Sequence, residues 1–386
     1  MGDDAATVSG DTVAEPPYTE PQLTKMAAIE SWMKGLSLNR KLFELCLPGS
    51  HDAGVYRDLK RNYTHEINPG AMTRCQNENI REQAMCGSRV FDIRVFLRKD
   101  RSANTDGYTE IPTMGHFALE TTHGKGGDYG GTLITALHDA ALFLKEQPSE
   151  FLIFRIGHTK CTEKVAEVLK HFRWDTKHRD EDDADAAHRQ VVIYTGANGN
   201  LAHLGYQQLK GKLLLVFDDE KFNDKSFKDS LKKSLFGPKT TDNGYYGYEK
   251  YPEYPKMLPI GLSFCGEYLG GGKEKAAVLW RGERGNWTAQ SADDLGRHAC
   301  EEHQKNHADR ADHLLWLYWQ QTGGNIWDNT TQDPQGMHAR LQKFLNVVSR
   351  DDRLAMPNVI GHDFVTKETC TKIVKLNPDL KDTDFT

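Results

Sequence analysis

The chain has 386 residues, of which 38% are hydrophobic and 27% are charged, and its formal net charge at pH 7 is -6. This composition is typical of a globular protein with a polar surface, and the length allows one large domain or two ordinary ones. The acidic balance argues against a nucleic-acid-binding protein, which usually carries a basic face. Apolar runs stay well short of the ~20 residues that a membrane-spanning helix needs, so we expect no transmembrane segment.

The first residues and the cysteines indicate the cellular setting. Residues 1–22 are acidic and poor in large apolar side chains, without the basic start or apolar middle of a signal peptide. We therefore expect a disordered tail and a protein that is cytoplasmic or peripherally bound to a membrane. The seven cysteines are scattered and form no CxxC pair, which indicates neither zinc nor a disulfide framework. Cys46 lies in an apolar run and is expected to be buried.

Apolar runs that resemble strands alternate with segments of helical periodicity along the chain. We expect helices over 21–33, 79–86, 133–146, 162–172 and 334–348, strands over 42–47, 89–97, 111–117, 151–156, 213–217, 314–319 and 358–364, and an uncertain strand over 257–264. Strands that alternate with helices are typical of a parallel α/β fold. Seven or eight strands favour a closed TIM-type β/α barrel over an open sheet.

Three segments interrupt this alternation. Residues 174–188 are a charged excursion, and residues 218–256 and 266–312 are long insertions rich in Gly, Tyr, Lys and Trp. We expect the two insertions to overlie one mouth of the barrel rather than to form a separate domain. Residues 23–386 are therefore expected to be one domain, and the protein a monomer.

Polar residues end most of the expected strands, where the functional residues of such barrels lie. These residues are His51, Asp52, Asp92, Arg94, His116, His158, Asp218, Asp219, Gln320 and Asp363. Histidine exchanges protons near neutral pH, and the planar fork of a guanidinium binds two phosphate oxygens at once. The combination therefore suits an attack on phosphorus.

Six motifs, in this order along the chain, resemble the catalytic domain of the phosphatidylinositol-specific phospholipase C family. They are LPGSHDAG (47–54), RCQNENIREQ (74–83), GSRVFDIR (87–94), FLKEQPSEFLIFR (143–155), LKGKLLLV (209–216) and NVIGHDFV (358–365). The resemblance covers most of residues 40–366 and implies a distorted TIM barrel. It also implies a phosphodiesterase that acts on a phosphoinositide lipid at a membrane surface. Cleavage of the glycerol-side P–O bond by the inositol 2-hydroxyl would give diacylglycerol and a cyclic inositol phosphate.

The resemblance further implies catalytic roles. His51 would be the general base on the inositol 2-hydroxyl, and Asp363 would orient it. A second histidine would be the general acid for the diacylglycerol oxygen. We favour His116, because an expected strand anchors it, over His123, which lies in a glycine-rich loop.

The residues around Arg94 indicate whether the protein needs a metal ion. Calcium-dependent members carry an asparagine after the first histidine and carboxylates on the second strand, whereas this chain carries Asp52 and Arg94. We count both as catalytic and expect neither a metal nor another cofactor, because the Arg94 cation replaces the charge of calcium. Calcium is the alternative, with Asp92 and Glu120 as candidate ligands, although hard cations need about six oxygens. Asp92 is equally well explained as the partner of an arginine inside the barrel.

Polar residues at other strand ends are candidates for binding the headgroup. They are Arg155, His158, Lys212 and Asp218. A structural ion pair is the alternative for Arg155. Three other functions stay open: the same chemistry on glycosylated inositol lipid anchors, a catalytically inactive barrel that binds a lipid headgroup or acts as a scaffold, and, less favoured, a metal-dependent glycerophosphodiesterase.

Overall fold

The structure is a computed structural model. It describes residues 25–56, 74–101, 108–116, 120–121, 124–125, 128–157, 161–174, 183–195, 201–218, 248–250, 257–259, 262–265, 297, 300–301, 304, 314–319, 334–351 and 353–386. Within these ranges, no helix combines the length and the apolar character that crossing a membrane requires.

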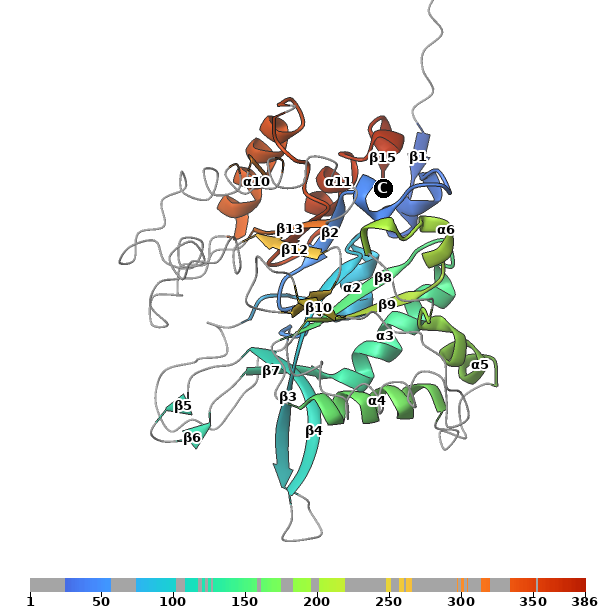
Figure 1. Cartoon of the computed structure of the whole chain (residues 1–386), viewed down its shortest axis with the longest axis vertical. Helices are drawn as coiled ribbons and strands as arrows, with labels where there is room; N and C mark the ends of the chain where they lie inside the picture. The colour runs from blue at the N-terminus through green and yellow to red at the C-terminus, as the bar shows by residue number, and fades with distance from the viewer. Residues whose placement is uncertain are drawn as a thin grey trace, which may run out of the picture.

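A parallel series of strands forms the centre of a nine-stranded sheet (Figure 1). In the order of their hydrogen bonding, the parallel strands are β12 (Leu262–Cys265), β13 (Leu314–Trp319), β14 (Val359–His362), β2 (Leu47–Ser50), β3 (Val90–Arg101), β8 (Leu152–Gly157) and β9 (Leu213–Asp218). Helices connect most of them, which confirms the predicted α/β class. In the described part of the chain the ladder does not close, since β9 and β12 are its two ends.

The helices expected over 79–86, 133–146, 162–172 and 334–348 are present, and the described residues contain others that were not expected. The α-helices are α2 (Ile80–Met85), α3 (Leu133–Glu146), α4 (Thr162–Trp174), α5 (Asp183–Val192), α6 (Tyr206–Leu209), α10 (Pro334–Val348) and α11 (Lys367–Val374). Short 3-10 helices are η1 (Ile29–Gly35), η2 (Leu42–Glu44), η3 (Leu201–His203) and η7 (Pro378–Leu380). Helix α3 begins where Thr132 caps it by accepting a hydrogen bond from the Thr135 amide.

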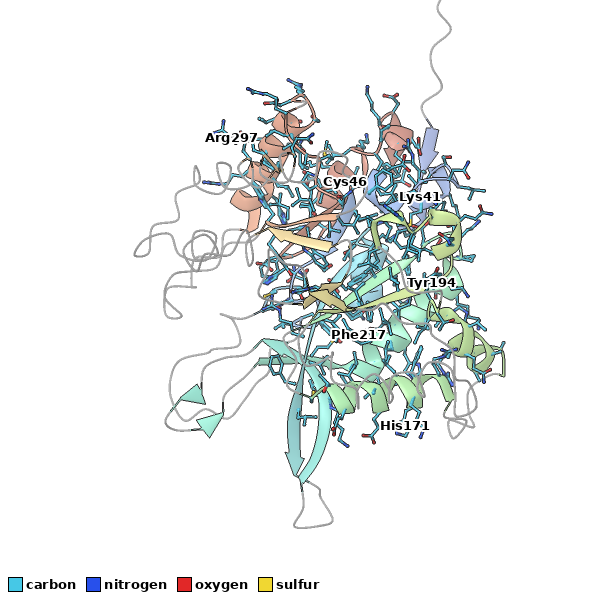
Figure 2. The ribbon with its side chains drawn as sticks, viewed as in Figure 1. Lys41, Cys46, His171, Tyr194, Phe217 and Arg297 are labelled. Carbon is cyan, nitrogen blue, oxygen red and sulfur yellow. The ribbon has the colours of Figure 1, made fainter. Side chains whose placement is uncertain are left out.

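Alternate residues of the strands pack on opposite faces of the sheet, as the period of a strand requires. Phe91 and Phe154 belong to the core that includes α3 and α4, whereas Val90 and Ile153 belong to a second core with Trp316. A third core joins α10 to β13 and β14. Figure 2 shows the side chains that fill these layers, with Phe217 buried and His171 of α4 at the surface.

One predicted barrel strand is instead an arm of a hairpin. Strand β4 (Tyr108–His116) pairs antiparallel with the second half of β3, and it also pairs with β7 (Asp128–Thr132). Figure 1 shows β3 and β4 extending together away from the parallel sheet. The expectation that 111–117 is a further barrel strand is therefore wrong, because the pairing partner is the extension of β3 and a strand pattern does not reveal its partner.

The amino-terminal predictions also need correction. The helix expected over 21–33 is replaced, in its described part, by β1 (Lys25–Ala27) and η1, and β1 pairs with β15 (Thr383–Phe385) at the other end of the chain. The strand expected over 42–47 is the 3-10 helix η2, with β2 beginning only at Leu47. The excursion over 174–188 contains the start of α5. Strand β1 forms because its partner lies at the far end of the chain, and such contacts override local preference.

Other expectations fall partly outside the described residues. These are the tail over 1–22 and most of the insertions 218–256 and 266–312. Strand β10 (Tyr248–Lys250) lies within the first insertion, and it pairs antiparallel with β11 (Met257–Pro259), which directly follows that insertion. One further small pair, β5 (Glu120–Thr121) with β6 (Gly124–Lys125), is antiparallel. Cys46 is buried, as predicted.

A buried ion pair fixes the amino-terminal side of the sheet. Arg89 donates from Nε and Nη2 to Oε2 of Glu150, over 2.9 and 2.7 Å, and both side chains are 0% exposed. The same guanidinium donates to the Glu30 carbonyl and lies over the ring of Trp32. The Met33 amide donates to the Glu150 carboxylate. This pair therefore joins η1 to the starts of β3 and β8.

Replacing Glu150 by Gln keeps the side-chain volume but leaves the Arg89 charge buried without its partner. We expect the free energy of unfolding, measured by urea denaturation, to fall by about 3–5 kcal/mol. Glu146→Gln is the control, because its pair with Arg81 is at the surface, with side chains 34% and 37% exposed. That change should cost at most about 1 kcal/mol. Equal losses in the two variants would contradict the account.

Candidate active site

Polar side chains from three neighbouring strands meet at one edge of the sheet. His51 and Asp52 directly follow β2, Asp363 directly follows β14, and Asp92 and Arg94 lie on β3. The parallel pairing of β14 with β2, and of β2 with β3, brings these positions side by side. The structure thus groups the residues that the sequence placed at strand ends.

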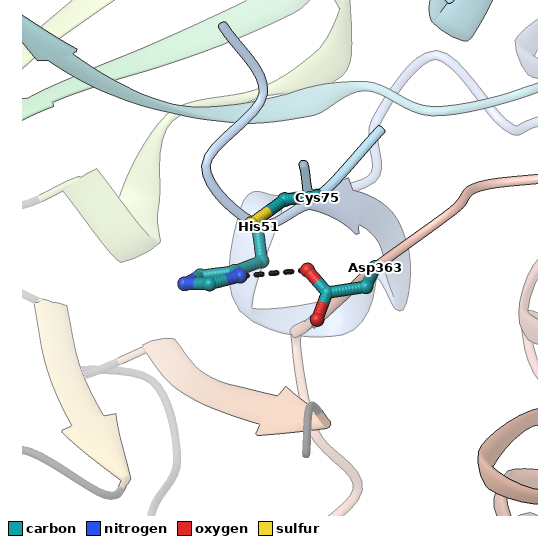
Figure 3. Close-up of side chains that lie close together, drawn as sticks. All are labelled: His51, Cys75 and Asp363. Atoms are coloured by element: carbon teal, nitrogen blue, oxygen red, sulfur yellow. Dashed lines mark hydrogen bonds and ion pairs between the residues drawn. The ribbon is translucent and has the colours of Figure 1, made fainter. Parts of the chain in front are cut away.

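The centre of the site is the pair formed by His51 and Asp363. Nδ1 of His51 lies 2.8 Å from Oδ1 of Asp363 (Figure 3). An ionised carboxylate only accepts hydrogen bonds, so Nδ1 carries the ring proton and Nε2 is left as the acceptor. Burial disfavours the charged imidazolium, but the negative charges of Asp52 and Asp363 outweigh it and raise the pKa of His51. The ring is therefore a stronger base than an isolated histidine.

Arg94 lies on the other side of the His51 ring. Its Nη2 is 3.2 Å from His51 Nε2 and 2.9 Å from Oδ2 of Asp92, and its Nε is 2.6 Å from Oδ1 of Asp52. Two carboxylates thus hold the guanidinium beside the accepting nitrogen. An anionic group bound by Arg94 would consequently lie next to a proton acceptor.

Asp92 is held between two arginines. Arg155 donates from Nη1 to Oδ1 of Asp92 over 2.8 Å and also donates to the hydroxyl of Tyr318. Burial disfavours the carboxylate, yet Arg94 and Arg155 outweigh it and lower the pKa of Asp92. Arg155 is 1% exposed, so the structure favours the ion-pair alternative over headgroup binding. The ring of Tyr318 packs edge-on against His51, with centroids 5.8 Å apart.

Lys212 does not lie with these residues. It precedes β9, at the amino-terminal edge of the sheet, and its Nζ donates to the Val191 carbonyl over 2.6 Å. The prediction that Lys212 binds the headgroup is therefore wrong. The error arises because Lys212 begins its strand rather than ending it, and the two ends of a parallel strand lie on opposite sides of the fold.

The remaining predicted residues are placed only in part. His123 and His158 lie outside the described residues, and for Asp218 and His116 the backbone alone is described. The backbone of Asp218 pairs with Gly157, which pairs in turn with Arg94. His116 lies two residues beyond Met114, the partner of Val95 on β3. Both backbones are thus near the level of Arg94 along the sheet.

The turns that follow β2 and β14 both contain an unusual backbone conformation. Asp52 has φ 40° and Phe364 has φ 52°, in the left-handed region that non-glycine residues rarely adopt. Such a conformation costs of the order of 1–3 kcal/mol and persists only where the surroundings hold it. Each strained residue is the direct neighbour of a residue of the central pair.

Gln76 stabilises these two turns through buried hydrogen bonds. Its Nε2 donates to the carbonyls of His51 and His362, over 2.9 and 3.0 Å, and its Oε1 accepts from the Val365 amide over 3.0 Å. The side chain is 0% exposed. Gln76 therefore joins the loop that carries His51 to the loop that carries Asp363. Sequence reasoning missed this residue, although the RCQN motif that contains it was part of the family resemblance.

Among the residues that the structure describes, two groups of side chains have the donor atoms to bind a metal ion. They are His51, Cys75 and Asp363, and His51, Asp52 and Asp92, with the ligand atoms of each group within 4.8 Å of one another. Neither group offers the six or so oxygens that calcium requires. In the second group both carboxylates already contact the Arg94 cation.

Comparisons with known proteins extend these observations. No protein-family model matches the chain. It is 24% identical over 191 residues to the 1-phosphatidylinositol phosphodiesterase of Staphylococcus aureus strain Newman, a match that spans 48% of this chain and 50% of that protein. The protein of the same name from strain NCTC 8325 / PS 47 matches equally well, over 47% of its length. The chain therefore spans about half the length of the curated relatives it matches.

Solved structures show the same fold over most of the chain. The phosphatidylinositol-specific phospholipase C of Listeria monocytogenes superposes with a TM-score of 0.55 at 14% identity, covering 91% of this chain and 99% of that one. The Staphylococcus aureus enzyme of the same description gives 0.53 at 15% identity, covering 91% and 98%. The protein thus has the barrel-type α/β fold of these phospholipases. The predicted resemblance to the phosphatidylinositol-specific phospholipase C family is confirmed.

Gln76→Met tests whether the hydrogen bonds of the Gln76 side chain position His51 and Asp363. We expect kcat for phosphatidylinositol, the substrate that the relatives' name implies, to fall by about 10²-fold, because small displacements of reacting groups are costly. KM should change little. The control is Gln83→Met, which removes an equally buried glutamine that donates to the Ala53 carbonyl over 2.9 Å.

Both glutamine variants should lose similar stability, because each removes buried hydrogen bonds. A comparable loss of kcat in both would show that Gln76 is merely structural. Non-additive effects of Gln76→Met and Asp363→Asn on kcat would support a shared role.

Proposed function

We propose that this protein is a phosphodiesterase that cleaves the glycerol-side P–O bond of phosphatidylinositol, giving diacylglycerol and a cyclic inositol phosphate. The observation that carries the proposal is the His51 imidazole, held by Asp363 at Nδ1 with Arg94 at Nε2. The name shared by the curated relatives, 1-phosphatidylinositol phosphodiesterase, supports the substrate. Because that substrate is a lipid, we place the reaction at a membrane surface.

In the first step, His51 Nε2 takes the proton of the inositol 2-hydroxyl as its oxygen attacks phosphorus. Asp363 stabilises the imidazolium that forms, and the raised pKa of His51 favours the transfer. General base catalysis of this kind contributes about 10²–10⁴-fold in rate. The hydroxyl would replace the Arg94 Nη2 contact at Nε2, so that Arg94 turns toward the phosphate.

Arg94 is proposed to stabilise the charge on the phosphate oxygens. A well-placed group of this kind contributes about 2.7–4 kcal/mol to the transition state. Asp52 and Asp92 hold the guanidinium in position, and the ion pair between Arg155 and Asp92 supports it from behind. With this cation supplied by the protein, we propose that the reaction needs neither calcium nor another cofactor.

The diacylglycerol oxygen must receive a proton as the P–O bond breaks. We propose His116 as its donor, supported by the pairing of β4 with β3, which brings the His116 backbone near the level of Arg94. His123 remains the alternative. His158 and Asp218 are proposed to contact the inositol headgroup. The intact group of His51, Arg94 and Asp363 argues against a barrel that has lost catalysis.

Removal of the base tests the assignment of His51. His51→Ala should lower the rate of cyclic inositol phosphate release from phosphatidylinositol vesicles by 10²-fold or more, roughly the contribution of a general base. Asp363→Asn should be severe as well, since Asn cannot stabilise the imidazolium. His171→Ala, on the exposed face of α4, is the control and should match the unchanged protein. Substantial turnover by His51→Ala with an unchanged product would rule the mechanism out.

The role of Arg94 is tested with a chelator and calcium. We expect full activity in excess EDTA, and a large loss in Arg94→Lys, because an ammonium is a point charge without the bidentate fork. Initial rates are measured with calcium titrated from chelated to millimolar levels. An unchanged protein that is inactive under chelation and recovers with calcium would contradict the proposal, and Asp92 and Glu120 would then be the first candidate ligands.

A further inference from the structure

A thiol that the proposed mechanism does not use lies beside the central pair. Cys75 is 5% exposed, and Figure 3 shows it next to His51 and Asp363. One donor atom from each of the three residues lies within 4.8 Å of the other two. The Cys75 Sγ also donates to Oδ2 of Asp52 over 3.8 Å. The site thus contains a soft ligand whose neighbours are a nitrogen ligand and a carboxylate.

The charges around this thiol favour a cation. Burial raises the pKa of Cys75 well above its usual range, and the carboxylates of Asp363 and Asp52 raise it further. The carboxylates of Asp52 and Asp363 beside the thiol also attract a divalent cation, which would replace the thiol proton. The resulting thiolate and the Asp363 carboxylate balance the charge of the ion.

The donor set selects the type of cation. Calcium and magnesium prefer oxygen ligands, whereas zinc binds cysteine sulfur, histidine nitrogen and carboxylate oxygen, often with three protein ligands and one water. Zinc bonds of about 2.0–2.3 Å place tetrahedral ligand atoms roughly 3.3–3.7 Å apart. Cys75 Sγ must therefore approach the other two donors by about 1 Å, and His51 Nδ1 and Asp363 Oδ1, now 2.8 Å apart, must separate by about 0.5 Å. Cys75 lies in a segment without helix or strand.

We propose that His51 Nδ1, Cys75 Sγ and Asp363 Oδ1 form an inhibitory site for a thiophilic divalent cation, with Zn²⁺ as its ligand. The inhibitory effect rests on the proposed role of His51. Zinc on Nδ1 displaces the proton there, and the neutral ring then carries its proton on Nε2, so the Arg94 Nη2 donor, now 3.2 Å away, must turn aside. The thiol proton passes to solvent. Nε2 can no longer accept the proton of the inositol hydroxyl, and Asp363 is engaged by the metal.

The other group of donors is a weaker competitor for the ion. It combines His51 with Asp52 and Asp92, and Arg94 contacts these carboxylates over 2.6 and 2.9 Å. A dication there would have to displace or approach the guanidinium. The site that contains Cys75 has its carboxylate 2.8 Å from a neutral ring nitrogen instead. Loss of zinc binding on removal of Cys75 therefore distinguishes the two groups.

The experiment uses the full chain, stripped of metal with EDTA and desalted. Zn²⁺ is titrated while phosphatidylinositol cleavage is followed, and binding is measured separately by competition with a chromophoric zinc chelator. Co²⁺ serves as a spectroscopic probe, because a sulfur-to-cobalt charge-transfer band reports a thiolate ligand. The variants are Cys75→Ala and Cys75→Ser. Cys161→Ala is the matched control, since Cys161 is also buried but lies in the core with α3 and α4.

We expect the unchanged protein and Cys161→Ala to lose activity in step with the binding of one zinc ion, and to show the charge-transfer band with cobalt. Both Cys75 variants should keep their metal-free activity, lose the tight zinc binding and lack the band. Equal zinc inhibition of the Cys75 variants, or cobalt binding without the band, would overturn the proposal. Should the metal-free protein fail to cleave phosphatidylinositol, the proposed function fails, while the chelator and cobalt readouts still decide the metal site.

Discussion

The pairing of β14 with β2 is the constraint on which the rest of the site depends. It sets His362 opposite Ser50. The residues that follow these two, Asp363 and His51, are therefore in contact although they lie 312 positions apart in the sequence. The two turns beyond it are strained, at Asp52 and Phe364, and the geometry persists because segment 75–76 bonds to both. Gln76 is thus as much a part of the site as the residues that carry charge.

The charges of the site form a connected chain. Asp363 contacts His51, Arg94 lies between Asp52 and Asp92, and Arg155 supports Asp92 from the interior. Burial makes each of these charges costly unless it is paired, so removal of one member leaves its neighbours uncompensated. The arrangement explains why a guanidinium stands in the site beside a base of raised pKa. It also places the Cys75 thiol close to Asp363 and His51, where we propose that zinc binds.

Much of the fold followed from local patterns. Buried apolar runs predicted β3, β8, β9 and β13, and helical periodicity predicted α3 with its observed bounds. The strand-end rule grouped His51 and Asp363 correctly, because in a parallel sheet the end of a strand is fixed once the strand is known. Arg94 joins them from within β3, at the last pair that β3 makes with β8. The roles of these residues stay proposals.

What failed depends on partners that are distant in sequence. Local sequence patterns predict neither the pairing of β1 with β15 nor the hairpin of β3 with β4, because an apolar run does not indicate which strand it pairs with. Lys212 was placed at the wrong end of the sheet because the residue type alone does not show whether a lysine precedes or follows its strand. Gln76 was missed because its function lies in three hydrogen bonds to backbone groups, which no side-chain pattern reveals.

The central claim is that His51 and Arg94 carry out an attack by the inositol 2-hydroxyl without a metal. The most direct measurement is phosphorus NMR of the products that the unchanged protein releases from phosphatidylinositol vesicles in excess chelator. The account predicts the resonance of a five-membered cyclic phosphodiester as the first phosphorus-containing product. Phosphatidic acid, a non-cyclic inositol phosphate as the first product, or no product until calcium is added would contradict it.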